Sequence, residues 1–422
     1  MLSSRNSHSS ASSHGQSRLI ATLLSGVCLS VTTLSVFAKT PTNENLELQL
    51  QLQSKVSAFE KSISQLEDGY DYYSPQLGEQ LDSLAQLYQQ QGKHSEALKT
   101  LDRAHRLNRI NNGIYHDDNS RLVEQKITSL MAMERWGEVG NHYRELFWLQ
   151  RRQYGENDPR LRPLLERIGQ WHIKAYTFEL GGNLLNHLLA AHKLFSLSLT
   201  ISQNQPNDLS QSATLEGLAL ASYYLAVHRE ENAPPVQVKN SFFSPEPHPT
   251  PARDEHIILS SYSNGLGALK RNVDLFRDNP DVPADAYPRA LIKLADWYQI
   301  FDKRASARRL YKEVWTTLEQ QKNITALEEL FDRPVNLPEN AVLDNPKKDQ
   351  SSQDVVMQFS VTPYGMAKRI RFDDEKSVDS IGLKVKARNR LRNLRFRPKM
   401  VDGKAVITAD MVMRYRFEGR AL

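Results

Sequence analysis

The chain has 422 residues, which is long enough for two or three domains with a large buried core. Its single cysteine, Cys28, excludes a disulfide within the chain and any metal site built on several cysteines. The formal net charge of +5 is unevenly spread, since residues 351–422 hold 16 Lys and Arg against 8 Asp and Glu. A basic tail with a net charge of +8 therefore follows a body with a net charge of −3.

The N-terminus has the pattern of an export signal. Arg5 and Arg18 precede an apolar run over residues 19–38, and the run ends on V-F-A, which fits a signal peptidase site. We expect a signal peptide over residues 1–38, cleaved after Ala38, and a mature protein in the periplasm of a Gram-negative bacterium. The run is also long enough to cross a bilayer, so the alternative is an uncleaved inner-membrane anchor that faces the periplasm.

A repeat typical of helical hairpins follows this leader. The segment LAQLYQQQGKHSEALKTLDRA from Leu84 has small and large residues at tetratricopeptide spacing, and LADWYQIFDKRASARRLYKEVW from Leu294 repeats the pattern. Weaker copies follow the first at 42-residue intervals, around Ile127 and Ile168, and the first helix of another copy is expected around Leu220. The spacing predicts a series of paired helices.

The repeats resemble the tetratricopeptide repeats of kinesin light chains over roughly residues 43–322. This resemblance implies a curved solenoid that binds peptides or proteins and performs no chemistry. We predict an all-α helical repeat domain over residues 39–325. Residues 231–254 are rich in Pro and lack periodicity, which predicts a long surface loop within that domain.

The first helices of three copies carry an acidic residue at one equivalent position. These residues, Asp82, Glu124 and Glu166, are each 42 positions apart, and the repeat register points them into the concave face. Together with Gln86 they are candidate partner-binding residues. Two interpretations are open: a solvated acidic face, or a binding site for a basic strand or helix of a partner.

The basic tail changes from helical to strand periodicity. The expected elements are, in chain order, a strand over 355–361, a turn at 363–365, a strand over 366–372, a helix from Asp373 to about Asn393, the segment RFRP at 395–398, a DG turn at 402–403 and a strand over 405–417. This order predicts a small α+β domain with one helix on an antiparallel sheet. We attribute the basic character of RFRP to the solvated face of that sheet.

In this order, the segments VVMQFSV, PYG, RFRP, DG and MVMRYRF resemble the C-terminal domain of the TonB family over about residues 330–422. The upstream segment RPVNLPENA also fits, although Leu stands where the family usually has Tyr. The resemblance implies a module that pairs strand to strand with a short segment of an outer-membrane transporter. The candidate partner-binding residues in this region are Leu337, Pro338, Arg395, Phe396 and Pro398.

Motifs for catalysis are absent from the sequence. It contains no H-E-x-x-H, G-x-S-x-G or G-x-x-x-x-G-K-[ST] motif, and its 12 histidines are scattered. We therefore expect neither an enzyme nor a cofactor or metal site. The basic segment KVKARNRLRNLRFRPK is interpreted as a solvated helix face. The alternatives are contact with an anionic membrane or peptidoglycan, and docking on the acidic column. Nucleic acid is not expected as a partner, because an exported protein meets little of it.

Taken together, the sequence predicts a periplasmic adaptor that combines a tetratricopeptide scaffold with a TonB-like module for an extended peptide. Its partner would be a protein or peptide, such as an outer-membrane transporter or an envelope complex. One alternative is a membrane-anchored energy transducer of TonB type that supports outer-membrane uptake. Another is an assembly factor that uses only the helical repeats.

Overall fold

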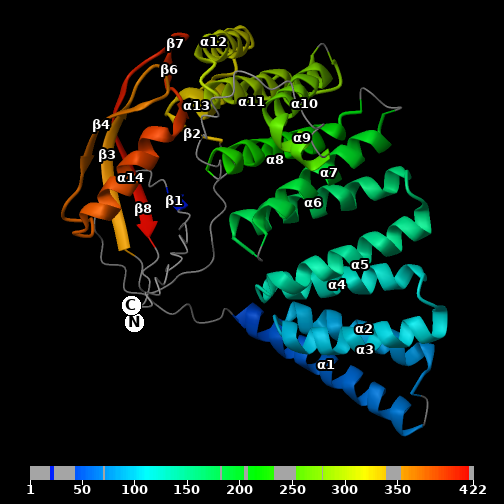
Figure 1. Cartoon of the computed structure of the whole chain (residues 1–422). Helices are drawn as coiled ribbons and strands as arrows, with labels where there is room; N and C mark the ends of the chain where they lie inside the picture. Colours follow the sequence, from blue (N-terminus) through cyan, green and yellow to red (C-terminus); the bar gives the residue numbers. More distant parts are fainter. Residues whose placement is uncertain are drawn as a thin grey trace, which may run out of the picture. The chain divides into compact units, whose positions relative to one another are not determined.

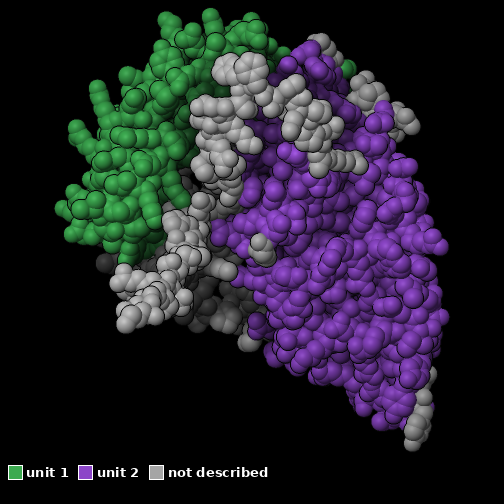
Figure 2. Space-filling model, in the orientation of Figure 1, with its two compact units in different colours: residues 1–28, 280–422 green, residues 29–279 purple. Residues whose placement is uncertain are grey.

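The computed structural model describes residues 20–22, 43–69, 72–180, 183–203, 208–231, 253–277, 279–338 and 353–417. The chain forms two compact units, coloured separately in Figure 2. Unit 1 comprises residues 1–28 and 280–422, and unit 2 comprises residues 29–279. Most of the predicted leader and of the predicted Pro-rich loop lies outside the described residues.

Unit 2 consists of helices within the part of the chain that the structure describes (Figure 1). They are α1 (Asn43–Asp68), α2 (Pro75–Gln90), α3 (His94–Asn112), α4 (Asp117–Ala132), α5 (Trp136–Tyr154), the 3-10 turn η1 (Pro159–Leu161), α6 (Arg162–Thr177), α7 (Leu184–Ile201), α8 (Gln211–Glu231), α9 (Arg253–Leu259) and α10 (Ser261–Phe276). The hairpins are α2–α3, α4–α5, α6–α7 and α8–α10. The paired helices predicted from the repeat are confirmed, and α2, α4, α6 and α8 contain the predicted repeat starts.

The first hairpin shows why the sequence folds in this way. Ser74 caps α2 by accepting a hydrogen bond from the backbone N–H of Leu77 at 3.1 Å, and Pro75 occupies the first helical position. Ala85 and Ala104 are buried at the hairpin contact, where small side chains let α2 and α3 approach closely. Repeat spacing therefore translates directly into helix packing.

One position departs from the repeat pattern without breaking the packing. Lys126 stands where a Leu is expected and is only 5% exposed. Its Nζ lies 2.8 Å from Asp102 Oδ1 and 3.0 Å from His105 Nδ1. Burial first, and then the Lys126 charge, lower the pKa of His105 to about 4. The ammonium group is thus satisfied by one carboxylate and one neutral imidazole.

Within the described residues, unit 1 contains four helices and the strands of the C-terminal region. Its elements are β1 (Ile20–Thr22), α11 (Ala286–Ile300), α12 (Arg304–Gln320), α13 (Ile324–Phe331), β2 (Val335–Leu337), β3 (Gln353–Val361), β4 (Ala367–Phe372), α14 (Ile381–Asn393), β5 (Arg395–Arg397), β6 (Met400–Val401), β7 (Lys404–Ala405) and β8 (Thr408–Phe417). The main sheet is antiparallel in the order β1-β8-β3-β4, while β2 pairs with β5 and β6 pairs with β7. Helices followed by a small sheet with its own helix agree with the predicted fold class.

The core of the sheet lies between its inner face and α14, which contacts β3 and β4 (Figure 1). Ala387 and Leu391, four residues apart on α14, are fully buried. They belong to one apolar cluster with residues of β3 and β8 that include Met357, Phe359 and Met413. The strand expected over residues 355–361 is therefore confirmed, and its alternate residues from Val355 to Val361 belong to this cluster.

Two predicted boundaries in this region are wrong. The helix begins at Ile381 rather than Asp373, because Ser380 caps it and the preceding residues form turns. The DG turn joins only β6 to β7, and the last long strand begins at Thr408 and pairs with β3. Asp410 has a φ of 55° near a register shift between β3 and β8. Ile407, expected within the strand, precedes it and is 66% exposed.

Candidate partner-binding site

Residues of the RFRP segment join the sheet to the helices of unit 1. Arg397 has no exposed surface. Its Nε and Nη2 donate to Asp296 Oδ1 at 3.0 Å and Oδ2 at 2.6 Å, and its Nη1 donates to the Leu330 carbonyl at 3.3 Å. Tyr311 also donates to Asp296 Oδ1, at 2.8 Å. A buried ion pair is stable only when its polar atoms are satisfied in this way.

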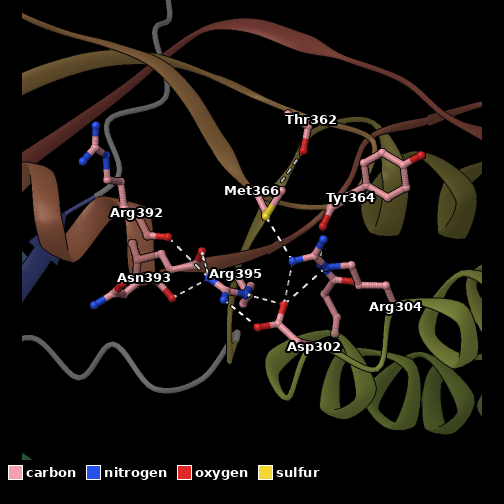
Figure 3. A network of polar contacts seen from close by, with 10 residues as sticks. Asp302, Arg304, Thr362, Tyr364, Met366, Arg392, Asn393 and Arg395 are labelled. Carbon is pink, nitrogen blue, oxygen red and sulfur yellow. Dashed lines mark hydrogen bonds and ion pairs between the residues drawn. The ribbon is translucent and has the colours of Figure 1, made fainter.

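Arg395 makes a second, more exposed bidentate pair on the same strand (Figure 3). Its Nε lies 3.0 Å from Asp302 Oδ1 and its Nη2 lies 2.7 Å from Oδ2. Arg304 donates to Oδ1 as well, at 3.1 Å, so Asp302 lies between two guanidinium groups. The hydrogen bond from Arg395 is the largest of the contributions that lower the pKa of Asp302.

The turn between β3 and β4 contacts the same strand. The Phe396 backbone N–H donates to the Gly365 carbonyl at 2.9 Å, and Gln299 Nε2 donates to the Tyr364 carbonyl at 2.7 Å. Gly365 has a φ of 69°, and a Cβ there would lie 2.0 Å from the Phe396 carbonyl oxygen. Only glycine fits this position, which explains why the PYG turn ends on it.

The structure brings the five predicted C-terminal residues together, but four of them do not lie on an open surface. Leu337, Phe396 and Pro398 are buried, and Leu337 lies opposite Arg395 in the β2–β5 pair. Pro338, half-buried, follows a cis peptide bond. The assignment of RFRP to a solvated sheet face is wrong for Arg397, because Asp296 on α11 takes up its charge inside unit 1.

This junction groups α11, α12 and α13 with the sheet in unit 1, whereas the sequence placed a domain boundary between residues 325 and 330. The sequence features that form this junction are two carboxylates, one on α11 and one directly after it. Asp296 and Asp302 stand in the strongest late repeat, and two arginines alternate in RFRP. Their pairing over about a hundred residues cannot be read from local spacing.

In unit 2, the three carboxylates of the predicted acidic column have partners inside the chain. Asp82 is 9% exposed and accepts hydrogen bonds from Gln125 Nε2 at 2.8 Å and Gln86 Nε2 at 3.2 Å. It also forms an ion pair with Arg121. The predicted residues Asp82 and Gln86 therefore lie together, and α4 supplies the neutralising charge.

The same arrangement recurs in the next hairpins. Glu124 lies 2.6 Å from Arg167 Nη2 on α6, and Glu166 accepts a hydrogen bond from the Ser198 hydroxyl at 3.4 Å. Arg162 Nη2 is 4.0 Å from Glu166. Asp82 and Glu124 each pair with an arginine on the first helix of the next hairpin, and Glu166 lies near an arginine on its own helix. The acidic residues therefore make contacts between and within hairpins. Arg121 and Arg167 follow their acidic partners by about one repeat length, and this spacing could have predicted the ion pairs from the sequence.

The main sheet leaves one long edge largely open. Along β8, the outer side pairs with β1 only at Arg414, Tyr415 and Arg416. Residues 408–413 pair with no strand on that side within the described part of the chain. Unpaired backbone N–H and C=O groups on an edge strand are the structural requirement for strand addition.

Two further features bear on the kind of site. Among the described residues, no three His, Cys, Asp or Glu side chains are grouped so that they could hold a metal ion. Within the same residues, every helix is too short or too polar to cross a membrane.

Comparison with known proteins gives structural likenesses only. No family model matches the chain, and no curated protein matches it in sequence. A structure of a kinesin light chain protein of Podosopora anserina with nearly identical TPR-like repeats is 14% identical and has a TM-score of 0.39, covering 58% of this chain and 95% of that one. BtubC (BKLC) from P. vanneervenii is 12% identical with a TM-score of 0.39, covering 71% and 96%. The TPR2AB domain of yeast Sti1, solved in complex with pHSP90, is 12% identical with a TM-score of 0.22, covering 67% and 95%.

Proposed function

We propose that this protein is a non-catalytic interaction scaffold whose C-terminal sheet takes up an extended peptide along the outer edge of β8. The open edge over residues 408–413 is the observation that supports the proposal. Helical hairpins in unit 2 supply a second surface for a protein partner, as repeat arrays of this kind do. The resemblance to TonB domains supports the same mode of binding.

Strand addition suits this edge for a physical reason. A peptide of six residues could pair with residues 408–413 through main-chain hydrogen bonds, with alternate side chains giving specificity. In the described structure, Ile20–Thr22 already pairs with part of the edge, so the edge can accept a strand. These three residues belong to the predicted leader, and cleavage after Ala38 would free the whole edge.

We further propose that the protein acts in the periplasm as a soluble adaptor after cleavage of the leader. An anchored transducer of TonB type is the alternative, and it requires the leader to remain in the inner membrane. N-terminal sequencing of the protein purified from its host separates the two. A first residue of Lys39 supports the adaptor, and an intact leader in the membrane fraction supports the transducer.

Hydrogen exchange tests the strand-addition proposal. The chain beginning at Lys39 is mixed with heptapeptides, among them the chain's own leader segment RLIATLL. Binding peptides should slow exchange of outer-edge amides of β8, at residues 408–413 or, for RLIATLL in the register of Ile20–Thr22, from residue 412 onward. The control is the same peptide with N-methyl groups on alternate residues, which cannot donate hydrogen bonds along one edge.

Protection by the N-methylated control, or no protection by any peptide, would exclude pairing at β8. In that case the scaffold would work through its helical repeats alone. A pull-down that compares the chain beginning at Lys39 with one carrying substitutions in β8 would then find the same partners.

A further inference from the structure

A cleft of about 1000 Å³ lies within unit 1, apart from the open edge of β8. One wall is α12, and the other is made by the β3–β4 turn and the β6–β7 hairpin. The residues that matter for the argument are Arg308, Lys312, Trp315, Tyr364, Met400 and Glu319. No residue of the open edge over 408–413 lines this cleft, although Pro398 of the predicted partner-binding set does.

The cleft contains positive charge that the described residues do not neutralise. Arg308, Arg309, Lys312 and Lys404 line it, are exposed, and make no ion pair or side-chain hydrogen bond with the described residues. Arg308 and Lys312 are also four residues apart on one helix, where like charges repel each other. An anionic ligand would relieve that repulsion.

The charge changes sign along the cleft. Arg308, Lys312, Trp315 and Glu319 follow each other at spacings of four, three and four residues, so they share one face of α12. They span about 16 Å at the rise of an α-helix. An extended peptide covers about 16 Å with five residues. The face thus offers cations at one end, an indole in the middle and a carboxylate at the other end.

The middle of the cleft is apolar and rigidly supported. The Trp315 ring packs against Phe331 with a centroid distance of 5.7 Å. The DG turn approaches it so closely that a Cβ on Gly403 would lie 3.3 Å from Trp315 Cδ1. Met400 is buried beside this turn. An apolar side chain of a ligand would therefore meet a fixed surface.

We propose that this cleft binds an extended acidic peptide of a protein partner, about five residues long, with carboxylates beside Arg308 and Lys312 and an apolar side chain against Trp315. A peptide fits better than a nucleic acid, because Glu319 and Asp402 in the same cleft repel a uniform polyanion. It also fits better than a bilayer, since a flat surface cannot enter a concave site.

Fluorescence anisotropy with the chain beginning at Lys39 tests this site. The probe is a labelled heptapeptide with three glutamates followed by leucine and phenylalanine. The double variant Arg308→Glu/Lys312→Glu should weaken binding at least about tenfold, since it replaces two charge-assisted contacts by repulsion. The affinity should also fall as salt rises. Circular dichroism confirms that each variant is folded.

The matched control is Lys368→Glu/Arg371→Glu, which makes the same change of charge at exposed positions on β4. It should change the affinity less than about twofold, because the cleft does not contain these residues. Equal weakening by both double variants would mean that only net charge matters, and it would overturn the proposal. Absence of binding at 100-fold excess of protein over probe would do the same.

Two competitors separate the classes of ligand. A single-stranded oligonucleotide of eight bases and vesicles with 30% anionic lipid are added to the complex of chain and peptide. Neither should displace the peptide at equal concentration of charge. Displacement by either one, lost in Arg308→Glu/Lys312→Glu, would reassign the cleft to nucleic acid or to membrane. An N-methylated peptide should still bind, which distinguishes this site from the β8 edge.

Discussion

Arg397 and Asp296 form a bidentate ion pair in the interior of unit 1, although they are 101 residues apart in the sequence. The Nε–Oδ1 distance is 3.0 Å and the Nη2–Oδ2 distance is 2.6 Å. Both side chains are buried, with 0% of Arg397 and 9% of Asp296 exposed. The pair connects the short strand β5 to α11. Removal of either charged side chain would leave the other charge buried and uncompensated.

The variant Arg397→Met should therefore destabilise unit 1 by about 3–5 kcal/mol. Hydrogen exchange of β3 amides under increasing denaturant measures this free energy of unfolding locally. The matched control is Arg395→Met, whose partner Asp302 is half exposed, and it should cost about 1 kcal/mol or less. Adding Asp296→Leu to Arg397→Met should recover stability; a further loss would contradict the buried-charge explanation.

Gly365→Ala should strongly destabilise the turn between β3 and β4. The new methyl group would clash with backbone, the Phe396 carbonyl oxygen, and φ is positive there. We expect a loss of more than about 2 kcal/mol in a thermal or denaturant melt. Gly382→Ala on α14 meets no atom within 4 Å and should be neutral or stabilising by up to about 1 kcal/mol. Equal effects of the two variants would contradict the close approach.

The contacts between hairpins should differ in strength with their burial. Asp82→Ala removes a nearly buried carboxylate with three partners and should cost about 2–3 kcal/mol, because hydrogen bonds to a charged group are lost. Glu124→Ala removes an exposed partner of Arg167 and should stay within about 0.5 kcal/mol. Hydrogen exchange of amides in α2 and α4 measures the loss of stability in each variant. A larger loss for Glu124→Ala than for Asp82→Ala would contradict the assigned contacts.

Unit 2 should lose stability in mild acid. His172 Nδ1 and His187 Nδ1 lie 2.9 Å apart, and His187 Nε2 donates to the Leu180 carbonyl at 2.9 Å. Because His187 donates through Nε2, it must be neutral to accept at Nδ1 from His172, and protonation of its Nδ1 would break the contact. Burial, with a smaller contribution from the neighbouring His187, lowers the pKa of His172 to about 4, and burial also lowers the pKa of His187.

Because these pKa values are lower in the folded than in the unfolded state, the unfolded chain binds more protons as the pH falls from about 6.5 toward 4. Stability is therefore complete above about pH 6.5 and declines below it, by up to about 1.4 kcal/mol per pH unit for His172. His172→Phe should make the decline shallower in denaturant melts between pH 8 and 5. An unchanged slope would exclude the pair as its source.

Local patterns predicted the elements that depend on neighbours in sequence. The small and large residues of the first repeat, such as Ala85, and the strand periodicity over residues 355–361 each determine structure over a few residues, and the helix pair and the strand they predict were confirmed. The helical array follows from them because each hairpin packs on the next.

Contacts between distant residues were not predictable in the same way. RFRP was expected at a binding surface, yet Arg397 is buried because α11 brings Asp296 to it, and Phe396 is buried because it packs in the core of the sheet against Phe359. The acidic column was expected from Asp82, Glu124 and Glu166, but the cations opposite were overlooked. The cleft beside α12 also escaped detection, since it needs the β6–β7 turn to lie against Trp315.

The junction between β5 and α11 limits how this chain can be rearranged in evolution. A recombination event that transferred only residues 330–422 to another protein would deliver a sheet with an unsatisfied guanidinium in its interior, and it would leave a buried carboxylate behind. A transfer that keeps the sheet stable therefore has to include the helices from Pro280 onward.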